Sequence, residues 1–205
     1  MRVGVFGGSF DPPHLGHLSI AEEVMERLNL DEVWFIPANT SPHKLDAPPV
    51  DPTHRMRMLS LMLEGRRGFK VLDIELKKQP PSYTIDTLRQ LKQHYPHFDF
   101  YLIMGDDAVQ GFLRWKDPEE IVKLARLAIV RRGALEDISF LQSSPQVLAA
   151  VKNGYLKTSL YPASSTSIRK LVREKGDFSR FLTPEVSEYI RHHNLYSGIE
   201  VKPRD

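Results

Sequence analysis

Short apolar runs alternate with longer segments of helical period along most of this 205-residue chain. Such runs are typical of strands buried on both faces, and the segments between them are long enough to form crossover helices. The alternation therefore predicts an α/β fold with a doubly wound parallel sheet. The expected strands are Arg2–Phe6, Val33–Pro37, Lys70–Ile74, Phe98–Met104, Leu127–Val130 and Lys157–Leu160.

A small polar residue followed by proline marks the expected start of four helices. These pairs are Asp51-Pro52, Asp117-Pro118, Ser144-Pro145 and Thr183-Pro184. The polar side chain caps the helix, and a proline at the first helical position loses no hydrogen bond there. The length and the 41% hydrophobic content allow one good core. We therefore expect a single domain over residues 1–205 with a small C-terminal helical part.

Charge and composition exclude several classes of partner. Lys and Arg total 28 against 26 for Asp and Glu, without a long block of one sign, so no nucleic-acid partner is expected. The chain has no cysteine, which excludes disulfides and thiolate sites. No run approaches the roughly 20 apolar residues of a membrane span. We expect a cytoplasmic protein without membrane contact, and a homo-oligomer is compatible with the sequence.

Two segments interrupt the alternation. Ala38–Pro52 contains four prolines directly after an expected strand, which predicts a long loop at the carboxyl edge of the sheet. Open α/β sheets bind their ligands at that edge. Leu135–Gly154 is interpreted as an insertion with its own short helix, and it carries no recognisable chemistry.

The stretch from Gly7 to His17 lies between the first expected strand and an amphipathic helix. Its consecutive glycines let backbone N–H groups approach an anion, and the start of the helix adds unpaired donors. The glycines match neither the dinucleotide-binding pattern nor the P-loop. His14 and His17 are three residues apart, so both can face a phosphate near the helix start. An isolated pair of this kind is more often a surface feature or half a metal site.

A second candidate anion site follows the last expected strand, at Ala163–Arg169. Ser164 or Ser165 can cap the next helix, which leaves Arg169 in its first turn beside free N–H groups. Taken alone, Arg169 is more simply a surface arginine. Two helix starts suited to anions on one parallel sheet predict a polyphosphate ligand.

The motif His14-Leu15-Gly16-His17, with Ser165–Arg169 as its second signature, resembles the nucleotidyltransferases of the H-x-G-H class. The chain is more narrowly similar to the bacterial nicotinate mononucleotide adenylyltransferases. That similarity rests on Gly7–Pro12, on Ser41-Pro42-His43-Lys44, on Ser82–Thr87, and on Gly105-Asp106-Asp107 followed by Trp115. Val130-Arg131-Arg132-Gly133 departs from the Arg-Pro-Gly turn expected in that family, which concerns the adenine pocket.

The resemblance implies a Rossmann-like fold and a set of site residues. ATP would be held by Gly7, Gly8, Ser9, Phe10, Gly105, Asp107, Ser165 and Thr166, with His14, His17 and Arg169 as the catalytic residues. Nicotinate mononucleotide would contact Asp11, Thr40, His43, Lys44, Tyr83, Thr84 and Trp115. Mg²⁺ would be bound mainly through the ATP phosphates, so no protein metal ligand is expected.

Several of these residues also have a plainer interpretation. Asp107 fits a helix cap after the strand, Trp115 fits a core position, and Tyr83-Thr84 fits an ordinary helix start. His43-Lys44 fits a solvated loop as well as a lid. The alternative functions are a phosphopantetheine adenylyltransferase, which leaves Ser41–Lys44 and Ser82–Thr87 unexplained, and a nucleotide-binding regulator without turnover.

Overall fold

The computed structural model describes residues 1–39, 49–79, 81–130, 144–159 and 161–198. Its centre is a six-stranded sheet with the order β3-β2-β1-β4-β5-β6, in which each neighbouring pair is parallel. The strands are β1 (Arg2–Gly8), β2 (Glu32–Pro37), β3 (Phe69–Val71), β4 (Asp99–Gly105), β5 (Ala125–Val130) and β6 (Tyr155–Leu156). This order is the Rossmann order, so the predicted fold class is confirmed.

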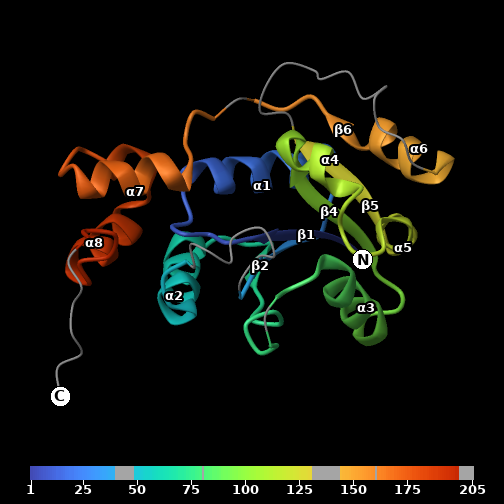
Figure 1. The fold of residues 1–205 in the computed structure, drawn as a ribbon, viewed down its shortest axis with the longest axis horizontal. Coiled ribbons are helices and arrows are strands. Elements are labelled where there is room, and N and C mark those ends of the chain that lie inside the picture. Colours follow the sequence, from blue (N-terminus) through green and yellow to red (C-terminus); the bar gives the residue numbers. More distant parts are fainter. Residues whose placement is uncertain (40–48, 80, 131–143, 160, 199–205) are drawn as a thin grey trace.

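Helices cover both faces of the sheet (Figure 1). They are α1 (Leu15–Arg27), α2 (Pro52–Leu63), α3 (Thr84–His94), α4 (Asp106–Phe112), α5 (Pro118–Leu124), α6 (Pro145–Gly154), α7 (Ser165–Arg173) and α8 (Pro184–His192), with a short 3₁₀ helix at Ser179–Phe181. Helices α2, α5, α6 and α8 begin at the four prolines that the sequence marks as helix starts. The predicted side-chain caps form at Asp51 and Thr183 but not at Asp117 or Ser144. The predicted short helix of Leu135–Gly154 is α6, while residues 135–143 lie outside the described ranges.

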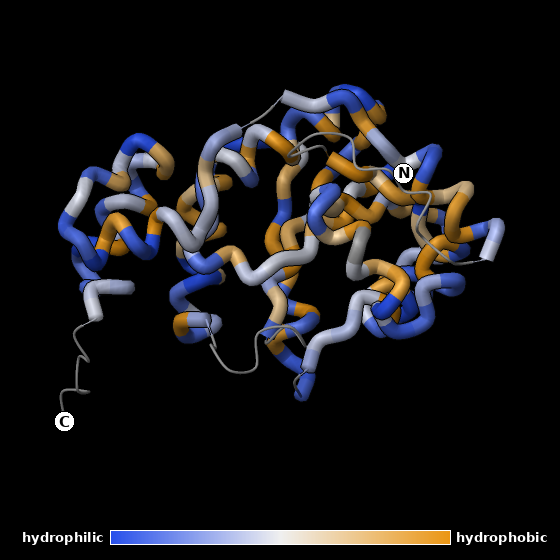
Figure 2. Tube along the Cα trace, turned by 45° about the horizontal axis from the view of Figure 1, so that its top comes forward, coloured by the Kyte–Doolittle hydropathy of each residue, from blue (hydrophilic) through white to orange (hydrophobic). Residues whose placement is uncertain are grey.

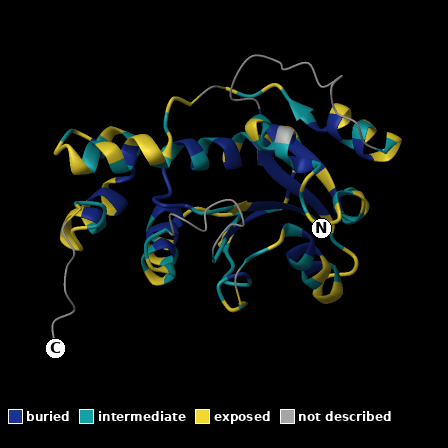
Figure 3. Ribbon diagram, viewed as in Figure 1, coloured by how far each residue is buried: buried dark blue, intermediate teal, exposed yellow. Residues whose placement is uncertain are grey.

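Alternate residues of the central strands feed two hydrophobic cores. Val33 and Phe35 of β2 join the core beneath α1, α2, α7 and α8, whereas Trp34 and Ile36 join the core beneath α3, α5 and α6. Burial on both faces makes these strands apolar throughout. Hydrophobic residues accordingly gather along the inner elements, and exposed residues lie on the outer faces of the helices (Figures 2 and 3).

Two strand predictions need correction. β3 ends at Val71 rather than Ile74, because the chain turns back where Leu76 N–H and Lys77 N–H donate to the Asp73 carbonyl. β6 is Tyr155–Leu156, and the described residues after it, from Lys157 to Ser159, are not in a strand. Pairing begins directly after Gly154, where a Cβ would lie 2.9 Å from the Leu127 Cβ, so only glycine allows this close approach.

The carboxyl ends of β1 and β4 lie side by side at the centre of the sheet, where the strand order reverses. β1 continues through α1 to β2 on one side, and β4 continues through α4 and α5 to β5 on the other. Such a switch point leaves a crevice in which α/β proteins bind ligands. Within the described ranges, no helix has the length and apolar character needed to cross a membrane.

Candidate active site

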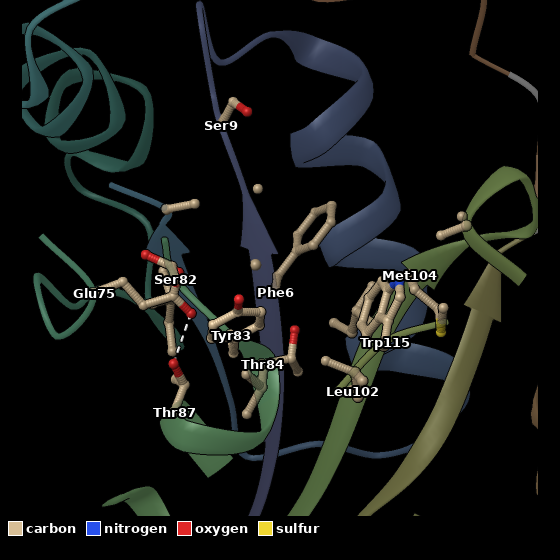
Figure 4. A pocket seen from close by; sticks show the side chains of 18 of the residues that line it. Phe6, Ser9, Glu75, Ser82, Tyr83, Thr84, Thr87, Leu102, Met104 and Trp115 are labelled. Carbon is tan, nitrogen blue, oxygen red and sulfur yellow. Dashed lines mark hydrogen bonds between the residues drawn. The ribbon is translucent and has the colours of Figure 1, made fainter. Parts of the chain in front are cut away.

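A cavity of about 460 Å³ opens at this switch point. Its walls come from the end of β1, the start of α3, the end of β4 and the segment around Trp115 (Figure 4). Ten of the residues that the sequence assigns to the site line it together: Gly7, Gly8, Ser9, Phe10, His17, Tyr83, Thr84, Gly105, Asp107 and Trp115. These residues are far apart in sequence, but the parallel sheet brings the carboxyl ends of its strands to one edge.

The loop after β1 is held in an unusual backbone conformation. Phe10 has φ 47°, in the left-handed region that residues other than glycine rarely adopt. Its ring is buried and packs edge-on against the His17 ring, with 5.0 Å between the centroids. A Cβ on Gly8 would lie 3.2 Å from the Phe10 ring, so the loop can pass the ring this closely because Gly8 has no side chain.

His14 and His17 form a stacked pair at the start of α1. His14 is the N-cap residue, and its N–H donates to Nδ1 of His17 at 3.2 Å. The ring centroids are 3.7 Å apart, so both rings lie on one side of the helix start, as their spacing predicts. His17 reaches the cavity wall, whereas the His14 side chain is buried behind it.

The second anion segment meets the first one directly. Ser164 caps α7 by accepting from Ser167 N–H at 3.1 Å, and Ser165 Oγ donates to the Pro12 carbonyl at 2.9 Å. Arg169 Nη1 donates to the Asp11 carbonyl at 2.7 Å. Arg169 is the fifth residue of α7 and lies in its second turn, so its placement in the first turn was wrong. Two hydrogen bonds thus join these loops, which lie more than 150 residues apart in sequence.

The start of α3 forms the opposite wall of the cavity. Tyr83 is its N-cap residue and makes no side-chain cap, so the first N–H groups of the helix have no side-chain acceptor at that position. Ser82 Oγ accepts from Asn39 N–H at 3.2 Å, which ties this start to the end of β2. The exposed Tyr83 ring lies 4.9 Å from Lys116 Nζ. A helix start of this kind is suited to a carboxylate.

The third wall follows β4. Gly105 is the N-cap residue of α4, so Asp107 is not a helix cap but the second residue of the helix, where its carboxylate also suits the helix dipole. The Trp115 ring is partly buried and packs against Phe112, with 5.4 Å between the centroids. The core position of Trp115 is therefore confirmed, and because Trp115 also lines the cavity, its contact with the mononucleotide stays a prediction.

Sequence reasoning missed a buried polar group beside α3. Glu75 is 7% exposed and lines the cavity, and Thr87 Oγ1 donates to its Oε1 at 2.7 Å (Figure 4). Burial raises the pKa of Glu75, although hydrogen bonds from Thr87 and Ser82 oppose the shift. The sequence signal that could have pointed to this part of the site is the spacing of Thr84 and Thr87, which places both residues on one side of a helix. Arg114 and Lys116 were missed as well, although they flank Trp115 and line the cavity.

Arg55 is a second unpredicted feature. Its guanidinium is completely buried and donates to the carbonyls of Ser9 at 2.9 Å and Ala38 at 2.7 Å, and its Nε donates to that of Val50 at 3.0 Å. One side chain of α2 therefore fixes the loop after β1 to the segment after β2. Burial lowers the pKa of Arg55, and the charge of Asp11 opposes this effect.

Five of the described predicted residues do not line the cavity: Asp11, His14, Ser165, Thr166 and Arg169. Asp11 is buried, and its Oδ1 accepts from Tyr196 Oη and Val50 N–H. Thr40, His43 and Lys44 lie outside the described ranges, as do Arg131 and Arg132 of the departing turn.

Comparison with known proteins agrees with this geometry. Residues 5–171 match the cytidylyltransferase-like family model. A nicotinate-nucleotide adenylyltransferase of Bacillus subtilis is 33% identical over 96% of this chain and 99% of its own length. A probable nicotinate-nucleotide adenylyltransferase of Oceanobacillus iheyensis is 38% identical over 95% of this chain and 96% of its own length.

A solved structure shares the fold. Plasmodium falciparum nicotinic acid mononucleotide adenylyltransferase, complexed with NaAD, aligns with a TM-score of 0.74 at 21% identity, over 95% of this chain and 97% of its own. The family model covers residues 5–171, which include both candidate anion-binding segments, and the Bacillus subtilis relative covers 96% of the chain. The chain therefore belongs to the nicotinate-nucleotide adenylyltransferase family of cytidylyltransferase-like proteins.

Proposed function

We propose that this protein transfers the adenylyl group of ATP to nicotinate mononucleotide, giving nicotinate adenine dinucleotide and pyrophosphate in NAD biosynthesis. The observation that carries the proposal is one cavity that joins the β1–α1 loop to the uncapped start of α3 and to Trp115. The first of these suits phosphates, the second a carboxylate, and the third an aromatic ring. Relatives of 33% and 38% identity that carry this name support the choice of substrate.

The ATP end of the site is formed by the two joined anion segments. Backbone N–H groups at Gly8 and Ser9, together with His14, His17 and the α7 start with Arg169, would hold the phosphates. Ser165 and Thr166 lie at that same start, beside the Pro12 carbonyl. Gly105 and Asp107 would face the ribose, since both line the cavity at the end of β4.

The mononucleotide end lies between α3 and Trp115. The N–H groups at Thr84 and the following residue would receive the nicotinate carboxylate, and the Trp115 ring would lie against the pyridine. Arg114 and Lys116 line the same part of the cavity and supply positive charge near the mononucleotide phosphate. Contacts with Asp11, Thr40, His43 and Lys44 stay predictions.

Catalysis follows from placement and charge stabilisation rather than from a covalent intermediate. A phosphate oxygen of the mononucleotide attacks the α-phosphorus of ATP in line. One P–O bond forms while the bond to the bridging oxygen of the β-phosphate breaks, and that oxygen leaves with the electron pair as pyrophosphate. The histidines, Arg169 and backbone donors face the charge that develops on the phosphoryl oxygens.

Mg²⁺ fits this site as a companion of ATP. The groups beside the proposed phosphate position are N–H donors, hydroxyls and cations, which suit phosphate oxygens rather than a metal. Among the described residues, no group of three metal-ligating side chains gathers. Phosphates and water would therefore hold the ion, which supplies positive charge to the leaving pyrophosphate. A cytoplasmic location stays a prediction.

Product analysis tests the proposal directly. The protein is incubated with ATP, Mg²⁺ and either nicotinate mononucleotide, its amide or phosphopantetheine, and the product is identified by mass. We expect nicotinate adenine dinucleotide, with kcat lower by on the order of 10² in His17→Ala, as when one preorganised donor is lost. A dephospho-coenzyme product would instead support the phosphopantetheine enzyme. Absence of any product, with ATP still bound, would support the regulator.

A further inference from the structure

The Asp11 carboxylate contacts three segments that lie far from it in sequence. Its Oδ1 accepts from Tyr196 Oη at 2.7 Å and from Val50 N–H at 3.3 Å. Its Oδ2 lies 3.7 Å from Arg169 Nη1, which is beyond hydrogen-bonding distance. The Asp11 side chain is only 10% exposed, and its charge also acts on the buried guanidinium of Arg55.

Arg169 makes one long ion pair with this carboxylate but no hydrogen bond to it. Its Nη1 donates to the main-chain carbonyl of Asp11 at 2.7 Å, and its Nη2 lies 3.4 Å from Thr166 Oγ1. An arginine so close to a carboxylate is normally drawn into a two-pronged ion pair with both oxygens. Here the two donors on Oδ1 fix the carboxylate with one oxygen turned away from Arg169.

Tyr196 lies in a strained turn after α8, and this turn places its side chain near Asp11. It has φ 64°, and Asn194 and Gly198 also have positive φ values, of 51° and 76°. Backbone conformations that a tyrosine rarely adopts persist where other contacts over-determine them. The Tyr196 ring packs against the core beneath α1 and α2, and its hydroxyl reaches Asp11 from there.

We propose that Tyr196 is a positioning residue for adenylyl transfer. Its hydroxyl holds Asp11 so that the ion pair with Arg169 stays a single long contact of 3.7 Å, and this keeps the Arg169 guanidinium available to the triphosphate of ATP. Without the hydroxyl, the carboxylate turns both oxygens toward Arg169, and the pair becomes close and two-pronged. The inference rests on the proposed function, because it requires Arg169 to contact ATP.

A double-mutant cycle tests this competition. Tyr196→Phe should raise the Kd for ATP and lower kcat by about tenfold or more, the scale of loss expected from a small misplacement at a reactive site. The KM for nicotinate mononucleotide should change little. In the Asp11→Asn background the ion pair cannot form, so adding Tyr196→Phe should alter kcat by no more than about twofold, the usual scatter of independent changes.

Two outcomes would overturn the proposal. One is a Tyr196→Phe protein with unchanged ATP affinity and kcat. The other is an equal loss from Tyr196→Phe in both backgrounds, which would mean that the phenol supports the fold rather than the carboxylate. Tyr189→Phe is the matched control, because Tyr189 also lies in the C-terminal part of the chain and the change also removes a hydroxyl. That hydroxyl lies 2.9 Å from His54 Nδ1. The control variant should leave ATP affinity unchanged.

Thermal melts accompany all four proteins of the cycle. Asp11→Asn removes the charge that opposes the effect of burial on Arg55, so a lower melting temperature is expected in that background. ATP affinity is measured without the second substrate, by titration calorimetry. The cycle therefore stays informative if nicotinate mononucleotide proves to be the wrong substrate, whereas the product analysis fails in that case.

Discussion

Gly16 is the residue on which the arrangement of the two histidines depends. A Cβ at this position would lie 2.9 Å from His14 Nδ1 and 2.9 Å from Tyr161 Cδ1, closer than atoms can approach without movement. Gly16→Ala should therefore displace the His14 ring from its stack on His17. We expect kcat to fall by at least about tenfold while the fold is kept, since a small displacement at a reactive site is costly.

The control for this change is another glycine of a helix. Gly111 has open space, with Trp115 Nε1 the nearest atom at 4.0 Å, and Ala should stabilise a helix there by about 0.5–1 kcal/mol. Melting temperature and steady-state rates are measured for both variants. A Gly16→Ala enzyme with normal kcat would show that the stack has no role in turnover.

Glu75 gives the stability of the protein a defined dependence on pH. Burial raises the pKa of Glu75 above its ordinary value of 4.5, so the folded state binds this proton more tightly than the unfolded state. The resulting stabilisation is fully present below pH 4.5 and is lost as the pH rises through the raised value. Glu75→Gln has no proton to lose and should gain stability relative to the natural protein as the pH rises.

Urea unfolding between about pH 4 and 8 measures this difference, a range that spans ordinary and raised carboxyl pKa values. At the acidic end, the free energies of unfolding of the natural protein and of Glu75→Gln should change with pH in the same way. As the pH rises, the difference between them should grow in favour of Glu75→Gln. Parallel curves would mean that Glu75 titrates normally despite its burial.

At the scale of elements, the start of α3 predicts a preference for the acid substrate over its amide. An amide turns an NH₂ group toward the helix N–H groups or satisfies only one of them. The unpaired buried donor costs roughly 1–3 kcal/mol, which corresponds to about fivefold to 150-fold in kcat/KM. Thr84→Ala should weaken this preference only modestly, because the proposed donors belong to the main chain.

Competition assays with both mononucleotides measure the ratio. Thr84→Pro, which deletes one N–H at the first position of the helix, should reduce the preference much more than Thr84→Ala. Melts of the proline variant separate loss of the donor from loss of the helix. Equal kcat/KM for acid and amide in the natural protein would rule out the carboxylate contact.

Element starts were largely predictable, and element ends were not. A polar residue before proline locates four helix starts, because proline geometry is local, although only Asp51 and Thr183 cap their helices through the side chain. The ends of β3 and β6 depend on where the chain turns back and on a close approach at Gly154, which involve residues far apart in sequence. Local propensity carries no information about such contacts.

The same distinction applies to the site. Sequence placed Gly7–Phe10 and His17 in one site, and they do line one cavity, because the loop and the helix start that carry them follow from local backbone geometry. Glu75 and Arg55 were not found, because their roles come from burial against distant partners, Thr87 in one case and the Ser9 carbonyl in the other. The sequence around a charged residue does not show which distant side chain or carbonyl will form its hydrogen bond.

At the scale of the whole molecule, ATP should stabilise the fold substantially. Its proposed contacts come from β1, α1, α4 and α7, so binding links segments that unfolding separates. At 100 times Kd the gain is about 2.7 kcal/mol, which raises the melting temperature of a protein this size by about 5–10 °C. Differential scanning calorimetry with and without ATP and Mg²⁺ checks this, with Arg169→Ala as the variant in which the shift should shrink.

The bond between Tyr196 and Asp11 has a consequence for a chain that is still being synthesised. The sheet order places β1 and β4 at the centre, so the switch point can assemble once residue 105 has left the ribosome. Arg169 and then Tyr196 join the loop after β1 only much later. A nascent chain would therefore have a folded centre before it could transfer an adenylyl group at the full rate, which requires the turn that carries Tyr196.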